Sequence, residues 1–135
     1  MNKYFLTLIL SSFFSGCFSD EKPNISRDEL LKRGRIGDPE LKVLVPKSIS
    51  DSLIDCGDYT PPCRFGYVVV IKKIKLKVLA YEKQSDALVT AKRVRGYVAR
   101  NWVFEDVTGE PILERFVQKH FGAVKAESLN SVKKK

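Results

Sequence analysis

The stretch Gly66–Glu82 limits the possible fold more than any other part of the chain. It is rich in valine, isoleucine and leucine, and in its second half apolar residues alternate with lysines. A repeat of period two is typical of a β-strand whose two faces meet different surroundings. Because the stretch is long for a single strand, we expect a bulge or bend near Lys72 and Lys73, where no Gly, Pro or Asn marks a tight hairpin.

Local capping signals predict a short helix and two main helices. Ser26, followed by Glu29, matches a capping box and starts the short helix, which we expect to end near Gly34. Ser85 should cap the first main helix, over Asp86–Arg95, in which apolar residues recur at intervals of three and four.

The second main helix is expected over residues 112–121. Pro111 suits a first helical position, and Gly122 suits the residue that closes a helix. The apolar residues between them are spaced as one face of an amphipathic helix.

Two further strands are expected, over Leu41–Val45 and residues 100–107. Elements in this order predict a mixed α/β fold of the α+β kind. We expect a small two-layer sandwich with a three- to four-stranded sheet and two main helices on one face, and a ferredoxin-like topology is one candidate. Residues 41–122 would form this globular domain, while residues 123–135, which lack periodicity, would form a disordered basic tail.

The amino terminus has the layout of an export signal. Lys3 precedes a mostly apolar run, Tyr4–Phe14, that is too short to cross a bilayer core of about 30 Å as a helix. The small residues Ser15 and Gly16 follow, and Cys17 comes directly after them. This arrangement predicts a cleaved signal peptide over residues 1–16.

The sequence Phe14-Ser15-Gly16-Cys17 resembles the lipobox of bacterial lipoproteins. The resemblance implies that Cys17 is acylated on sulfur, with palmitate or a similar chain, and becomes the new amino terminus. Residues 17–40 would then hold the lipidated cysteine, a tether and the short helix. In that family an Asp directly after the cysteine often signals retention in the inner membrane. Phe18 stands there, which favours the outer membrane, facing the periplasm. The alternative is an ordinary signal peptide in which Cys17 is incidental.

The three cysteines divide simply once the resemblance is accepted. Cys17 takes lipid, and Cys56 and Cys63 remain as a pair in a compartment that permits disulfides. The residues between them favour turns. A redox motif would need two residues between the cysteines, and a zinc site would need further ligands where His120 is the one histidine. We therefore expect a structural disulfide, no metal and no cofactor.

The positive charge is concentrated in one segment. The chain has a net charge of +8, and Arg64–Arg100 alone holds ten basic and two acidic residues. Such a segment can bind an anionic surface, although the same residues can also simply solvate the fold and blunt an edge strand. The candidate residues for an anionic surface are Lys72, Lys73, Lys75, Lys77, Lys92, Arg93 and Arg95.

No catalytic motif is present in the sequence, and we do not expect an enzyme. The sequence predicts a lipid-anchored cell-envelope protein that works as a structural or interaction module with a basic face. Its expected partners are the membrane, through the anchor, and anionic lipids, lipopolysaccharide or wall polymers; nucleic acid is disfavoured by the compartment. The alternatives are an inhibitor or immunity-type binder of another, unknown envelope protein, or a small envelope hydrolase.

Overall fold

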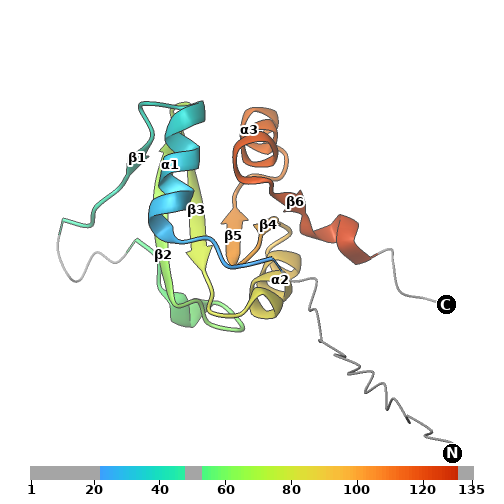
Figure 1. Cartoon of the computed structure of the whole chain (residues 1–135). Helices are drawn as coiled ribbons and strands as arrows, with labels where there is room; N and C mark the ends of the chain where they lie inside the picture. Colours follow the sequence, from blue (N-terminus) through green and yellow to red (C-terminus); the bar gives the residue numbers. More distant parts are fainter. Residues whose placement is uncertain (1–21, 48–52, 131–135) are drawn as a thin grey trace, which may run out of the picture.

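A computed structural model describes residues 22–47 and 53–130 of the chain (Figure 1). Cys17, the export signal, residues 48–52 and the end of the expected tail lie outside these residues. The elements are α1 (Arg27–Gly37), β1 (Lys42–Val43), the 3-10 turn η1 (Cys56–Asp58), β2 (Phe65–Ile71), β3 (Ile74–Ala80), α2 (Gln84–Arg93), β4 (Tyr97–Ala99), β5 (Trp102–Glu105), α3 (Pro111–Phe121), β6 (Val124–Lys125) and the 3-10 turn η2 (Ala126–Asn130).

Six strands form one antiparallel sheet in the order β1-β2-β3-β5-β4-β6. The strands β3 and β4 run in the same direction, because both are antiparallel to β5, which lies between them. The elements from β3 to β6 follow the order of a ferredoxin-like unit, which is β-α-β-β-α-β. Here, however, β6 pairs with β4, since β2 already occupies the other edge of β3.

The prediction of an α+β fold is confirmed, whereas the predicted strand number and helix layout are wrong. The sheet has six strands, and helices cover both of its faces. The reason lies in β3, where Leu76 and Val78 belong to the core beneath α1 and α3, while Leu79 belongs to the core beneath α2. Because both faces of the sheet carry buried apolar residues, helices cover each face, and the result has three layers rather than two.

The expected single strand over Gly66–Glu82 is a tight hairpin of β2 and β3. Ile71 pairs with Ile74, and the two residues between them, Lys72 and Lys73, have φ of 51° and 66°. A two-residue hairpin loop of type I′ needs positive φ at both positions, which glycine and asparagine favour. Both positions hold lysine, so no hairpin signal is present in the sequence here. The buried Asp38 compensates, since one of its carboxylate oxygens accepts a hydrogen bond from the Lys72 backbone N–H at 2.7 Å.

A second hairpin replaces the single strand expected over residues 100–107. The chain turns between β4 and β5 at Arg100, whose φ is 55°. Asn101 holds this turn in place, because its amide accepts a hydrogen bond from Ile25 N–H at 2.8 Å and donates one to the Tyr81 carbonyl at 3.2 Å. Both partners are far away in the sequence, so the turn depends on tertiary contacts.

The ends of α1 and α3 agree with the sequence, but the prediction that Ser85 caps a helix over Asp86–Arg95 is wrong, because α2 runs from Gln84 to Arg93 and follows Lys83 without a side-chain cap. The Ser26 hydroxyl accepts a hydrogen bond from Glu29 N–H at the start of α1, and α3 begins at Pro111 and ends at Gly122, with φ of 67°. The short helix α1 continues past Gly34 to residue 37. Gly34 does not end the helix. Its role is in packing, because a Cβ added there would lie 2.6 Å from the Leu41 side chain.

The prediction of a disordered tail is wrong for residues 123–130. They form β6 and η2, and Ala123 and Ala126 are buried in the two cores. The Ala126 backbone N–H also donates to the Gly96 carbonyl at 3.0 Å. Small apolar residues without helical or strand periodicity gave no sequence signal for this order.

Candidate functional site

The candidate basic residues lie at four separate places in the fold. Lys72 and Lys73 form the tip of the β2–β3 hairpin, and Lys75 and Lys77 lie on the α2 side of β3. The other three lie near the end of α2. Lys92 and Arg93 are in its last turn, and Arg95 is in the loop that leads to β4. The structure therefore does not join the seven residues into one continuous face.

Two of these cations have acidic partners. Lys77 Nζ lies 3.9 Å from a carboxylate oxygen of Asp106, and Arg95 Nε lies 3.8 Å from Glu127. All four side chains are substantially exposed, and exposed pairs at such distances contribute little to stability. They do reduce the positive potential that Lys77 and Arg95 offer to an anionic partner.

The strand register places Lys42 beside the strand lysines. Lys42 pairs with Val70 across β1 and β2, and Val70 pairs with Lys75 across β2 and β3, so the three side chains share one face of the sheet. Lys42 was not among the predicted basic residues. Only the pairing of β1 with β2 reveals this neighbour, and the sequence does not specify that pairing.

A second basic cluster, which the sequence analysis missed, lies where α3 meets the hairpin tip. It surrounds a shallow hollow of about 260 Å³. We call this cluster the tip patch. It consists of Lys72, Ile112, Arg115, Phe116, Lys119 and His120.

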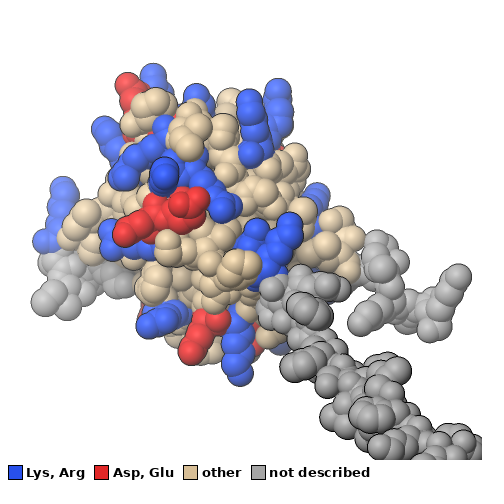
Figure 2. Space-filling view, in the orientation of Figure 1, with Lys and Arg blue, Asp and Glu red and all other residues tan. Residues whose placement is uncertain are grey.

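The spacing of the α3 residues in the tip patch is helical, at intervals of three and four. This spacing was the available signal, and it was overlooked because residues 101–135 have little net charge. Figure 2 shows Lys and Arg side chains projecting from the end of the molecule where α3 lies.

The cations of the tip patch have no acidic partner in the described part of the chain. Within residues 22–47 and 53–130, no carboxylate forms an ion pair with Lys72, Arg115 or Lys119. Asp38, which lies next to the hairpin tip, uses its two carboxylate oxygens for the backbone N–H groups of Glu40 and Lys72. Asp38 keeps its negative charge and lines a neighbouring hollow with Glu40 and Lys72, so the positive charge available to a partner lies mainly at Arg115 and Lys119.

His120 is fixed between α1 and α3. Its ring centroid lies 4.6 Å from that of Phe116. On the other side α1 approaches closely, since a Cβ added at Gly37 would clash with the His120 ring. The floor of the tip patch is consequently rigid, and the charged side chains of Arg115 and Lys119 project from a well-packed helix.

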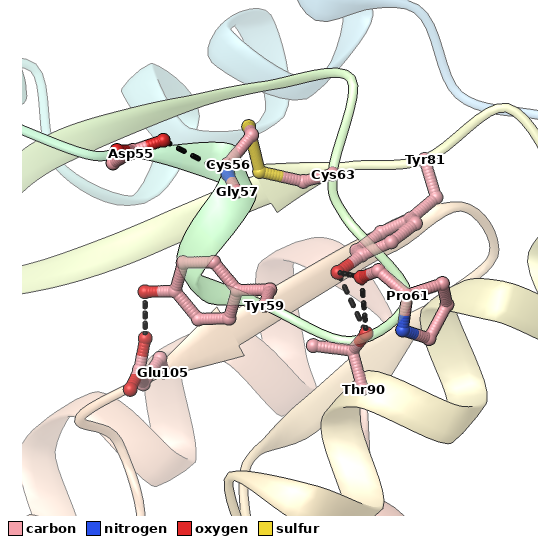
Figure 3. The surroundings of a disulfide bond; sticks show 9 residues. All are labelled: Asp55, Cys56, Gly57, Tyr59, Pro61, Cys63, Tyr81, Thr90 and Glu105. Atoms are coloured by element: carbon pink, nitrogen blue, oxygen red, sulfur yellow. Dashed lines mark hydrogen bonds between the residues drawn. A yellow bond between two sulfur atoms is a disulfide. The ribbon is translucent and has the colours of Figure 1, made fainter.

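The disulfide between Cys56 and Cys63 is confirmed (Figure 3). It closes a loop that forms hydrogen bonds with β5 and with Tyr81, the residue after β3. The Tyr59 hydroxyl donates to Glu105 at 2.5 Å, and the Pro61 carbonyl accepts a hydrogen bond from the Tyr81 hydroxyl at 2.8 Å. Burial and the Glu105 carboxylate both raise the pKa of Tyr59, so the phenol stays protonated and keeps donating.

The segment before α1 is bound to the fold rather than free. The carbonyls of Lys22 and Pro23 accept hydrogen bonds from Gln84 and Arg100, at 2.5 and 2.8 Å. Further along, the Ile25 carbonyl accepts one from the Trp102 indole at 2.7 Å. The tether predicted before α1 therefore ends, at the latest, at Lys22. This attachment lies at the opposite end of β3 from the hairpin tip (Figure 1).

Comparison of the chain with protein-family models, with curated proteins and with solved structures gave no match. Among the described residues, no helix is long and apolar enough to cross a membrane. The same part of the chain contains no group of three or more His, Cys, Asp or Glu residues placed to hold a metal ion.

Proposed function

We propose that this chain is a lipid-anchored cell-envelope protein that works as a non-enzymatic interaction module with a basic surface. The observation that carries the proposal is the Cys56–Cys63 disulfide. Disulfides persist in oxidising compartments outside the cytosol. This agrees with export by residues 1–16 and leaves Cys17 as the odd cysteine, at the position where a lipobox carries its acyl chains.

The docked segment at Lys22 defines how the anchor would hold the domain. Lys22 follows Cys17 by five positions, a distance of at most about 18 Å even for a fully extended chain. The other end of this tether is fixed to the fold, because Lys22 and Ile25 form hydrogen bonds with residues of α2 and of the β4–β5 hairpin. An acylated Cys17 would therefore keep the domain close to the bilayer surface, where its cations meet anionic headgroups.

Removing the acylated residue tests the anchor. Cys17→Ser should abolish the incorporation of labelled palmitate and move the protein from the membrane fraction to the soluble one. The matched control is Ser19→Cys in the Cys17→Ser background, which restores a thiol near the site but not after the small pair. If Cys17→Ser stays in the membrane fraction as the native protein does, the anchor proposal is contradicted.

A second candidate function is an inhibitor or immunity-type binder that presents the Cys56–Cys63 loop. The loop is held by the disulfide and by the bonds of Tyr59 and Pro61, while Asp58 at its surface remains exposed. A loop fixed in this way loses little entropy on binding a partner. Pull-down from envelope extracts with and without reductant tests it, since a partner that is retained equally after reduction would count against this function.

A further inference from the structure

We propose that the tip patch is the surface through which the domain contacts the phosphate-bearing headgroups of an anionic bilayer. The inference rests on the proposed function, because it is the anchor that brings the domain to the membrane. It assigns the contact to α3 and the hairpin tip, and it excludes the cations of α2, Lys92 and Arg93, from the contact.

Charge is the first argument for this surface. Lys72, Arg115 and Lys119 surround one hollow and form no ion pair with the described acidic residues. Arginine and lysine are suited to phosphate, the first through its planar fork of donors and the second as a point charge. The neighbouring helix α1 adds four basic residues and two acidic ones, and one of these acids, Glu29, is paired with Arg33 at 3.0 Å.

The second argument is the apolar residue between the cations. Ile112 is 49% exposed in the first turn of α3, beside Arg115 and above the buried Phe116. A helix that combines cations with an exposed apolar side chain is suited to the boundary between headgroups and acyl chains. A purely hydrophilic polyanion would leave Ile112 without a role, so this combination favours a lipid surface.

The tether reaches far enough for this orientation. Ile25 is part of the core beneath α1 and α3, whereas Lys22, where the tether begins, is bonded to Gln84 in the first turn of α2. The seven residues of β3 separate the docking site from the hairpin tip by about 23 Å. If the domain lies with its α1 and α3 side toward the bilayer, the docking site and the hairpin tip are both close to the membrane. A tether about 18 Å long permits this orientation. The helix α2 then faces away.

Photocrosslinking of the acylated protein tests the proposal. The photoreactive residue benzoylphenylalanine is placed at Ile112→Bpa, and at Val89→Bpa as the matched control, since Val89 is 42% exposed on α2. The protein is reconstituted in phosphatidylcholine vesicles with and without phosphatidylglycerol, and lipid adducts are identified by mass. We expect at least about tenfold more lipid adduct from position 112 than from position 89, and only where phosphatidylglycerol is present.

Charge reversal supplies the second arm. Arg115→Glu with Lys119→Glu should lower the adduct yield from position 112 by about tenfold or more. The matched pair Lys92→Glu with Arg93→Glu makes the same change of charge in the last turn of α2, and it should leave the yield unchanged. Thermal unfolding of each variant, together with the neutral pair Arg115→Gln and Lys119→Gln, separates loss of contact from loss of fold.

Three results would overturn the inference: equal adduct yields from positions 112 and 89, equal losses from the two charge-reversed pairs, or adducts in native membranes that are protein rather than lipid. The last result would assign the tip patch to an acidic protein partner. The anchor is measured separately, by the mass of the N-terminal peptide. A chain without lipid on Cys17 that still crosslinks to vesicle lipid from position 112 therefore contradicts only the proposed function.

Discussion

The Tyr97 hydroxyl donates a hydrogen bond to a carboxylate oxygen of Glu114 across 2.5 Å, and this bond joins β4 to α3. The other carboxylate oxygen of Glu114 accepts from the Gly109 backbone N–H at 3.1 Å. Tyr97 is almost fully buried, so its hydroxyl depends on this partner. The helix that carries the tip patch is thereby fixed to β4, the strand beside the edge strand β6.

Glu114→Gln should weaken the fold and reduce its sensitivity to acid. The hydrogen bond from Tyr97 is the main cause that lowers the pKa of Glu114. A lowered pKa contributes stability that is present above the ordinary pKa of a carboxyl group and is lost as the pH falls through the folded-state value. We expect a loss of about 1–2 kcal/mol at neutral pH and a shallower decline in acid, measured by urea unfolding across pH. A parallel decline in both proteins would contradict this.

Tyr97→Phe should act on the alkaline side. Burial of the phenol, with the Glu114 carboxylate beside it, raises the pKa of Tyr97 to about 12. The neutral phenol is therefore favoured by folding, and this contribution is fully present below pH 10 and is lost as the pH rises through the folded-state pKa. The variant should be less stable at neutral pH by about 1 kcal/mol and should lose less stability between pH 10 and 12. Tyr67→Phe, a partly exposed tyrosine on β2, is the control.

Lys73→Gly should stabilise the protein. Lys73 has φ of 66°, a conformation that costs a lysine about 1 kcal/mol more than it costs a glycine. The gain in thermal or urea unfolding should be of that size, whereas Lys75→Gly, in the regular strand β3, should destabilise. A stabilised Lys73→Gly would mean that the native lysine reduces stability and is better explained by function. A destabilised one would mean that the side chain supports the fold.

Gly34→Ala should destabilise the contact between α1 and α3. The added Cβ would lie 2.6 Å from the Leu41 side chain and 3.2 Å from the Phe121 ring. Overpacking of this kind costs about 1–3 kcal/mol, although alanine is otherwise the better helix former. Arg35→Ala, at the exposed neighbouring position, should change stability by less than about 0.5 kcal/mol. Equal stability of the two variants would show that the helices do not pack this closely.

Breaking the disulfide should cost stability without unfolding the sheet. Cys56→Ser with Cys63→Ser removes a short covalent loop, worth roughly 2.5 kcal/mol in the chain-entropy account. The loop keeps its bonds from Tyr59 to Glu105 and from Tyr81 to Pro61, so a folded protein with a lower midpoint of unfolding is expected. Circular dichroism and urea unfolding measure both. An unfolded double variant would mean that the bridge is required for folding.

What could be predicted from the sequence was local, and what could not depends on distant contacts. The cap at Ser26 and the limits of α3 at Pro111 and Gly122 were predicted because each uses neighbouring residues. The hairpin at Lys72 was not predicted, because it depends on Asp38, which lies 34 positions earlier in the chain. Residues without a turn signature can adopt positive φ when a buried acceptor holds them there.

The same reason explains the candidate site. Leu79 shares its face of β3 with lysines, so the alternation along the strand did not predict that α2 covers this face. The predicted basic residues were chosen by their density along the chain, whereas the tip patch joins Lys72 to Arg115 and Lys119 across more than forty positions. Charge density in sequence does not specify charge density in space.

The proposed lipid anchor at Cys17 brings the domain to the membrane, and the mass of the N-terminal peptide tests it directly. The chain is purified from the membranes of a bacterial host and digested, and its first peptide is weighed. The expected peptide begins at Cys17 and carries acyl chains. A peptide that begins elsewhere, or that contains an unmodified Cys17, would contradict it.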